Sequence, residues 1–147
     1  MVPVLLVLLA YLSGSVPYGA LLTRWLKGVD VRSAGSGNIG ATNVARVAGR
    51  GLGVLVLLLD AAKGAVPVAL SFLITGNSEV HAAVGFAAVL GHVFPAWLHF
   101  RGGKGVATAF GVIAVIQPWA AMADGHLACS ATANRGSGSE KKSRTPP

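Results

Sequence analysis

The stretch LGVLVLLLDAAKGAVPVALSFLI, residues 52–74, decides the fold class of this chain. As a helix rising about 1.5 Å per residue, it is long enough to cross the roughly 30 Å hydrocarbon core of a bilayer. Its only charged residues, Asp60 and Lys63, lie three positions apart and therefore share one helical face. Charges inside a span usually face a partner or a cavity. We therefore expect this pair either to support a functional site or to form an internal ion pair that only aids packing.

Further apolar runs lie on both sides of this stretch, over residues 2–22, 80–100 and 106–123. The chain is 53% hydrophobic and only 12% charged, whereas a soluble domain averages about 25% charged residues. The sequence therefore predicts an all-α, polytopic integral membrane protein with about four transmembrane spans.

The end of the chain differs in composition from the rest. Residues 124–147 are rich in Ser, Gly, Lys and Arg and contain few apolar side chains. Such a segment cannot bury enough apolar surface to fold. We expect a membrane-embedded domain over residues 1–123, followed by a disordered polar tail that is not its native continuation.

The net charge of +7 comes mainly from Lys and Arg residues between the apolar runs. Residues 24–50 carry several cations against a single acid, Asp30, and residues 101–104 carry Arg101 and Lys104. An excess of Lys and Arg in short loops predicts the cytoplasmic side of a membrane. A basic chain can also bind nucleic acid, but this placement between spans gives no reason to expect a nucleic-acid partner.

Two glycine-rich loops suggest the chemistry: GSGNIGATNVAR, residues 35–46, and RGGKGVAT, residues 101–108. Glycine lets backbone N–H groups approach and surround an anion. Arg46 can bind a phosphate through two parallel hydrogen bonds, and Lys104 adds a point charge. Neutral donors are available from Ser36, Asn38, Thr42 and Asn43. The two loops together are predicted to bind two phosphates, or one phosphate and a polar head group.

Other interpretations of these loops are weaker. Residues 35–40 match GxGxxG and Asp60 follows at a suitable distance, but a dinucleotide site needs a preceding strand, and here a charged loop precedes and Asp60 lies in a span. In GGKG, the residue after Lys104 is Gly105 rather than Ser or Thr, so the nucleotide-triphosphate loop does not fit. Tight connectors between spans remain an alternative. The histidines lack metal-ligand spacing, so no metal is expected, although His92 stays a candidate for support of the site.

At the level of longer segments, the chain resembles the bacterial acyl-phosphate:glycerol-3-phosphate acyltransferases of the PlsY type. The matching segments occur in order and cover most of residues 1–115. They are SGSVPYG (residues 13–19), DVRSAGSGNIGATNVAR (residues 30–46), LDAAKG (residues 59–64) and GHVFPAWLHFRGGKGVATAFG (residues 91–111).

This resemblance implies transfer of a fatty acyl group from acyl phosphate to the 1-hydroxyl of glycerol 3-phosphate, giving lysophosphatidic acid and phosphate in the bacterial cell (inner) membrane. It implies Ser36 and Arg46 as active-site residues with Asn38 beside them. The phosphate-binding loop for glycerol 3-phosphate is implied to comprise Gly102, Gly103, Lys104 and Gly105. The acyl phosphate is already activated, so no cofactor is expected. Membrane lipid is an expected partner, and the sequence leaves protein partners unknown.

The family's third motif, a GHxxNxxRLxxGxE-like segment, has no counterpart in this sequence. The resemblance is expected to end near Gln117, as in a shortened or frame-shifted copy. Two alternatives to the enzyme follow: a catalytically inactive membrane fragment, and a transporter of organic phosphate.

Overall fold

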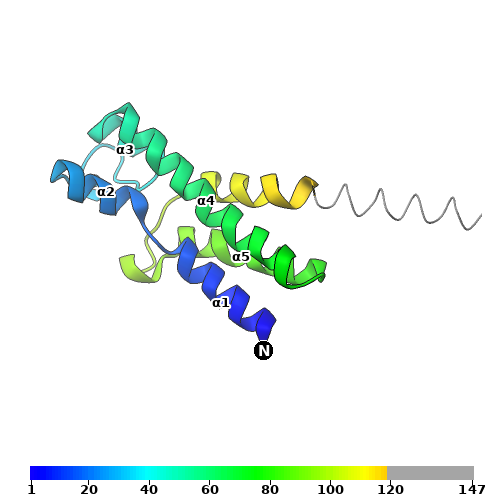
Figure 1. Cartoon of the computed structure of the whole chain (residues 1–147). Coiled ribbons are helices and arrows are strands. Elements are labelled where there is room, and N and C mark those ends of the chain that lie inside the picture. The colour runs from blue at the N-terminus through cyan, green and yellow to red at the C-terminus, as the bar shows by residue number, and fades with distance from the viewer. Residues whose placement is uncertain (119–147) are drawn as a thin grey trace, which may run out of the picture. The chain divides into compact units, whose positions relative to one another are not determined.

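The computed structural model describes residues 1–118 and is all-α over that part of the chain, as predicted. The chain divides into two compact units, Met1–Val115 and Ile116–Pro147, and the features below belong to the first. Figure 1 shows the order of the elements. They are α1 (Val2–Gly14), α2 (Tyr18–Lys27), η1 (Val31–Ser33), α3 (Ala41–Ala48), α4 (Arg50–Ile74), α5 (Ser78–Val93), η2 (Ala96–Leu98) and a further helix, Val106–Pro118.

Within the described residues, three segments are long and apolar enough to cross a membrane: Val2–Lys27, Arg50–Ile74 and Ser78–Leu98. They agree with the predicted spans to within a few residues, except that the first extends five residues beyond residue 22. The predicted fourth span is described only as the shorter helix Val106–Pro118, which covers about 20 Å. Its remaining residues, 119–123, and the predicted tail lie outside the described part.

The first span is broken between α1 and α2, within the segment SGSVP, residues 13–17. Pro17 caps the start of α2, and Ser15 is fully buried there. The Ser15 hydroxyl donates to the Tyr11 carbonyl at 2.8 Å, which satisfies a polar group that lipid could not. This segment of small and polar residues therefore serves packing at the break in the span.

Helices α1 and α5 pack through small residues. A Cβ placed on Gly14 would lie 2.1 Å from the Ala88 carbonyl oxygen, and one on Gly91 would lie 2.2 Å from the Tyr11 carbonyl oxygen. Each glycine thus brings the backbone of one helix onto the backbone of the other. Small residues at helix crossings are typical of membrane proteins, where dispersion contacts replace the hydrophobic effect.

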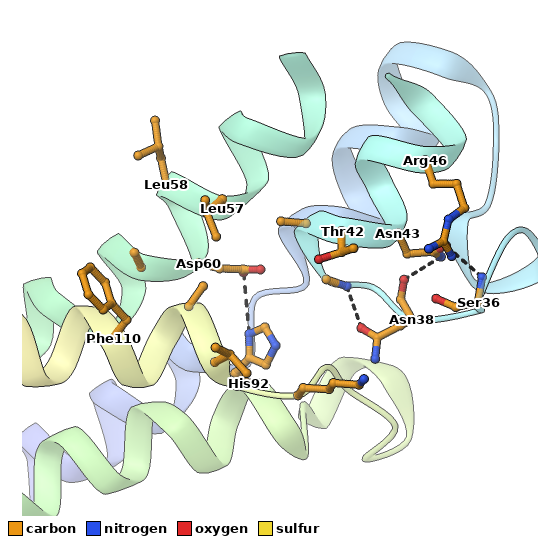
Figure 2. A pocket seen from close by; sticks show the side chains of 17 residues that line it. Ser36, Asn38, Thr42, Asn43, Arg46, Leu57, Leu58, Asp60, His92 and Phe110 are labelled. Carbon is orange, nitrogen blue, oxygen red and sulfur yellow. Dashed lines mark hydrogen bonds and ion pairs between the residues drawn. The ribbon is translucent and has the colours of Figure 1, made fainter. Parts of the chain in front are cut away.

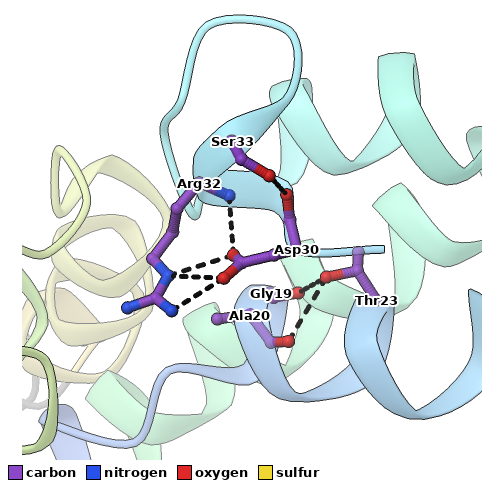
Figure 3. Close-up of polar contacts among 6 residues, drawn as sticks. All are labelled: Gly19, Ala20, Thr23, Asp30, Arg32 and Ser33. Carbon is purple, nitrogen blue, oxygen red and sulfur yellow. Dashed lines mark hydrogen bonds and ion pairs between the residues drawn. The ribbon is translucent and has the colours of Figure 1, made fainter. Parts of the chain in front are cut away.

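The loop between α2 and α3 is anchored to α4 by a small apolar core. Val31, Ile39 and Val44 are buried together with Val56 of α4. Next to this core, the Thr23 hydroxyl is fully buried and donates back to the Gly19 carbonyl at 2.7 Å (Figure 3). The first glycine-rich loop is therefore fixed on the beginning of α4 rather than free in solvent.

An exposed ion pair marks the start of this loop. The Arg32 guanidinium donates to both carboxylate oxygens of Asp30, with the shortest distance 2.7 Å from Nη2 to Oδ2 (Figure 3). This bonding lowers the pKa of Asp30 to about 2. Asp30 Oδ1 also accepts from the Arg32 N–H, so the carboxylate caps η1. Asp30 is therefore engaged locally.

We expect Gly14→Ala to destabilise the helix packing by about 1–3 kcal/mol, because the added methyl group would overlap the Ala88 backbone. Gly51→Ala is the matched control, since nothing lies within 4 Å of a Cβ at that helical position. Thermal unfolding in detergent measures both. Equal melting temperatures for the two variants would contradict the close packing of α1 on α5.

Candidate functional site

A cavity of about 790 Å³ brings the two glycine-rich loops together (Figure 2). Its polar lining comes from the first loop and α3 on one side and from Lys104 and Gly105 on the other, with Asp60 and His92 between them. The sequence-predicted residues that line it are Ser36, Asn38, Thr42, Asn43, Arg46, Asp60, His92, Lys104 and Gly105. The predicted meeting of the two loops is therefore present in the structure.

One buried side chain, Asn43 of α3, holds the first loop in shape. Its Oδ1 accepts from the Ser36 N–H at 2.8 Å, and its amide donates to the carbonyls of Val31, Ala34 and Asn38 at 2.9–3.1 Å. Asn43 is only 2% exposed. Its amide is thus used on the protein's own backbone. Asn43 positions the loop, whereas the sequence suggested a donor to phosphate.

Two turns of the first loop bring its backbone to the cavity. Gly35 and Gly37 have positive φ values of 61° and 71°, which glycine adopts without steric cost. Asn38 Oδ1 accepts from the Gly40 N–H at 2.8 Å, closing the turn that leads into α3. Gly40, Ala41 and Thr42 then line the cavity. The first N–H groups of a helix lack intrahelical acceptors, so α3 presents free donors there.

The second loop has a different hydrogen-bond pattern from the one expected. The N–H groups of Gly102 and Gly103 donate to the carbonyls of Val93 and His92, at 3.0 and 3.1 Å. Neither glycine lines the cavity. The loop instead presents Lys104, Gly105 and the start of helix Val106–Pro118. Gly102 and Gly103 therefore fix the loop against the end of α5, and their N–H groups are already bonded within the protein.

The charges of the cavity favour an anion. Among residues 1–118, neither Arg46 nor Lys104 forms an ion pair with a carboxylate. Two helix N-termini, those of α3 and of helix Val106–Pro118, contribute residues to the same lining. Helix N-termini carry partial positive charge and free N–H groups, which bind phosphates. The arrangement therefore suits a phosphate group.

A buried polar group lies behind these cations. The Lys63 ammonium pairs with Asp60 Oδ1 at 3.0 Å and donates to the Val16 carbonyl at 2.8 Å. His92 Nδ1 lies 3.7 Å from Asp60 Oδ1 and 3.2 Å from the Thr108 hydroxyl. Asp60, Lys63 and His92 are each 3–4% exposed. The predicted ion pair is thus present; Asp60 and His92 reach the cavity, and Lys63 supports them from behind.

The rest of the lining is apolar. Leu57, Leu58 and Ala61 of α4 face the cavity together with Val106 and Phe110. Phe110 and Leu58 are 71% and 61% exposed, so this wall continues onto the outer surface of the helices. A single cavity therefore offers both a cationic end and a hydrocarbon-like end. Within the described residues, no cluster of three His, Cys, Asp or Glu could hold a metal ion.

A family model described as glycerol-3-phosphate acyltransferase matches residues 4–134. The chain belongs to this family. A glycerol-3-phosphate acyltransferase of Myxococcus xanthus (strain DK1622) is 66% identical over 119 residues, covering 80% of this chain and 62% of the relative. One from Anaeromyxobacter dehalogenans (strain 2CP-1) is 56% identical over 124 residues, covering 81% of this chain and 61% of the relative.

A solved structure agrees with this assignment. The crystal structure of PlsY (YgiH), an integral membrane glycerol 3-phosphate acyltransferase in its glycerol 3-phosphate form, superposes with a TM-score of 0.76 at 46% identity. The match covers 83% of this chain and 61% of that one. The chain thus spans about three fifths of the length of these relatives. The family resemblance and the membrane fold predicted from the sequence are confirmed, and the family match continues to residue 134, past Gln117.

We expect Asn43→Ala to loosen the first loop, because three carbonyls and the Ser36 N–H would lose their partner, at a cost of roughly 1–3 kcal/mol. Trypsin should then cleave after the exposed Arg32 faster than in the unaltered chain. Thr42→Ala, which changes the neighbouring cavity residue, serves as the control. Cleavage at the same rate in both variants would contradict this role of Asn43.

Proposed function

We propose that this chain binds acyl phosphate and glycerol 3-phosphate in the cavity and transfers the acyl group to the 1-hydroxyl of glycerol 3-phosphate. The products are lysophosphatidic acid and phosphate. The observation that carries the proposal is a single cavity with two cations, Arg46 and Lys104, at one end and the apolar side chains of Leu57, Leu58 and Phe110 at the other. Neither cation forms an ion pair within residues 1–118. Names of relatives support the same reaction: the matched PlsY structures are described as glycerol 3-phosphate and lysophosphatidic acid forms.

The proposed reaction needs little covalent chemistry from the protein. The 1-hydroxyl oxygen attacks the acyl carbonyl carbon, an ester bond forms, and the carbon–oxygen bond to phosphate breaks. The departing phosphate takes up the hydroxyl proton, so no cofactor or covalent nucleophile is required. The chain contributes positioning and charge stabilisation. We assign phosphate neutralisation to Arg46 and Lys104, and orientation of a substrate oxygen to Ser36.

The remaining predicted residues support this site. Asn38 shapes the first loop through the turn at Gly40, and Gly102 and Gly103 anchor the second loop beside Lys104 and Gly105. An acyl chain has space along the apolar wall, which continues onto the surface of α4. We further propose that both loops face the cytoplasm from the bacterial inner membrane, because the segments that contain them, residues 24–50 and 101–104, carry the Lys and Arg residues between the spans.

Acyl transfer is tested with the chain reconstituted in lipid vesicles, by following phosphate release from acyl phosphate. We expect release to depend on glycerol 3-phosphate and to fall by about a hundredfold or more in Arg46→Ala, because one charge stabiliser is lost. Ser36→Ala should also lower it. Arg50→Ala, which removes a nearby cation that does not line the cavity, should retain activity.

Other outcomes would assign the alternatives. Absence of phosphate release in the unaltered chain, with glycerol 3-phosphate still bound, would indicate a non-catalytic phosphate-binding membrane protein. Uptake of labelled glycerol 3-phosphate into vesicles without an acyl donor would indicate a transporter. Either result would contradict acyl transfer by this chain.

The cytoplasmic placement of both loops is tested by labelling with a membrane-impermeant maleimide. In a Cys129→Ser background, Ser36→Cys and Lys104→Cys should react in inverted vesicles and not in intact spheroplasts. Gly76→Cys, in the exposed turn between α4 and α5, should show the opposite pattern. If Ser36→Cys and Lys104→Cys react from opposite sides, the two loops cannot share a cavity.

A further inference from the structure

A carboxylate is out of place in a cavity built for anions. Arg46, Lys104 and two helix N-termini favour phosphate there, yet Asp60 lines the same cavity and would repel a phosphate. It is the only acidic residue that residues 1–118 contribute to the lining. The presence of a carboxylate at this place therefore needs an explanation, which the surroundings of its two oxygens provide.

The two carboxylate oxygens of Asp60 have different surroundings. The Lys63 ammonium lies 3.0 Å from Oδ1, and His92 Nδ1 lies 3.7 Å from the same oxygen. Oδ2 forms no hydrogen bond with any residue from 1 to 118. No buried side-chain oxygen in that part of the chain lacks a hydrogen-bond partner. Oδ2 is therefore not sealed in protein, and because Asp60 lines the cavity, Oδ2 opens onto it.

The position of Asp60 is rigid. Lys63 is tied in turn to the Val16 carbonyl at 2.8 Å, at the break between α1 and α2. The side chain of Asp60 is 4% exposed, and Figure 2 shows it pointing between Thr42 and His92. Its charge is balanced from behind by the Lys63 ammonium, 3.0 Å away. Oδ2 of Asp60 is therefore a hydrogen-bond acceptor that faces the cavity and has no donor among residues 1–118.

From this geometry we propose that Asp60 recognises a hydroxyl group of the phosphate-bearing substrate. A carboxylate cannot bind phosphate, but it accepts a strong, charge-assisted hydrogen bond from an alcohol. This inference rests on the proposed function, because glycerol 3-phosphate carries phosphate and hydroxyl groups in one small molecule. Asp60 thereby selects a polyol phosphate over a plain alkyl phosphate, while Arg46 and Lys104 bind the phosphate of either.

The test compares two ligands on the full chain in detergent, by calorimetry: glycerol 3-phosphate and n-propyl phosphate, which has the same three-carbon skeleton without hydroxyl groups. The unaltered chain should bind glycerol 3-phosphate about tenfold or more tightly, the ratio expected from one hydrogen bond to a charged group. In Asp60→Asn that ratio should fall towards one. Binding of n-propyl phosphate should stay equal or become tighter, because a repelling charge is removed.

Two further variants guard against misfolding. Asp60→Leu/Lys63→Met replaces both buried charges by apolar groups, which proteins often tolerate better than one unpaired charge, and it should lose the same preference. Asp30→Asn removes a carboxylate that is engaged with Arg32 and does not line the cavity, so it should keep the preference. Circular dichroism and thermal melting establish that each variant is folded.

Each outcome separates this inference from the proposed function. If the Asp60 variants keep the preference, or weaken both ligands equally, Asp60 has only a structural role and the inference is overturned. If the unaltered chain binds both ligands equally, hydroxyl recognition is wrong while phosphate binding stands. If it binds neither ligand, the proposed function itself fails.

Discussion

The arrangement around the cavity depends on two contacts of the buried Lys63 ammonium. It joins α4 to the Val16 carbonyl at the point where the first span breaks, and it compensates the charge of Asp60. Within a bilayer both groups need partners from the protein, because lipid offers none. The Lys63 ammonium therefore supplies a hydrogen bond to the Val16 carbonyl and a counter-charge to the Asp60 carboxylate. Asp60 in turn lies 3.7 Å from His92 Nδ1, and the His92 carbonyl accepts from the Gly103 N–H. This series of contacts connects Lys63 to the second loop.

The two loops are held mainly by the helices beside them, and the Asn38 side chain closes one turn of the first. Asn43 reaches back from α3 to hold the first loop by its backbone, and the carbonyls at the end of α5 hold Gly102 and Gly103. In both cases a helix follows directly and directs its N-terminus at the cavity. The cations Arg46 and Lys104 are then left without carboxylate partners among the described residues. This combination of helix N-termini and cations suits an anion.

The sequence predicted the spans and the meeting of the loops, because hydropathy and the distribution of Lys and Arg are properties of local segments. The Asp60–Lys63 pair was predictable from helical spacing alone. The roles of Asn43, Gly102 and Gly103 were not, because they depend on which backbone groups tertiary contacts bring near them. Asn43 sits in a polar stretch among other candidate donors, and only its 2% exposure in the structure distinguishes it. The choice of hydrogen-bond acceptors for two glycine N–H groups leaves no trace in a sequence.

Glycines place backbone directly on backbone at several helix crossings: Gly14 on Ala88, Gly91 on Tyr11 and Gly111 on Ala61. Contacts of this kind contain no long side chain that could change rotamer and let one helix slide past the other. We therefore expect the helices of the described unit to move little against one another at these crossings. For the proposed acyl donor, we therefore expect entry past the exposed residues at the rim of the cavity, such as Phe110 and Leu58, rather than through separation of the helices.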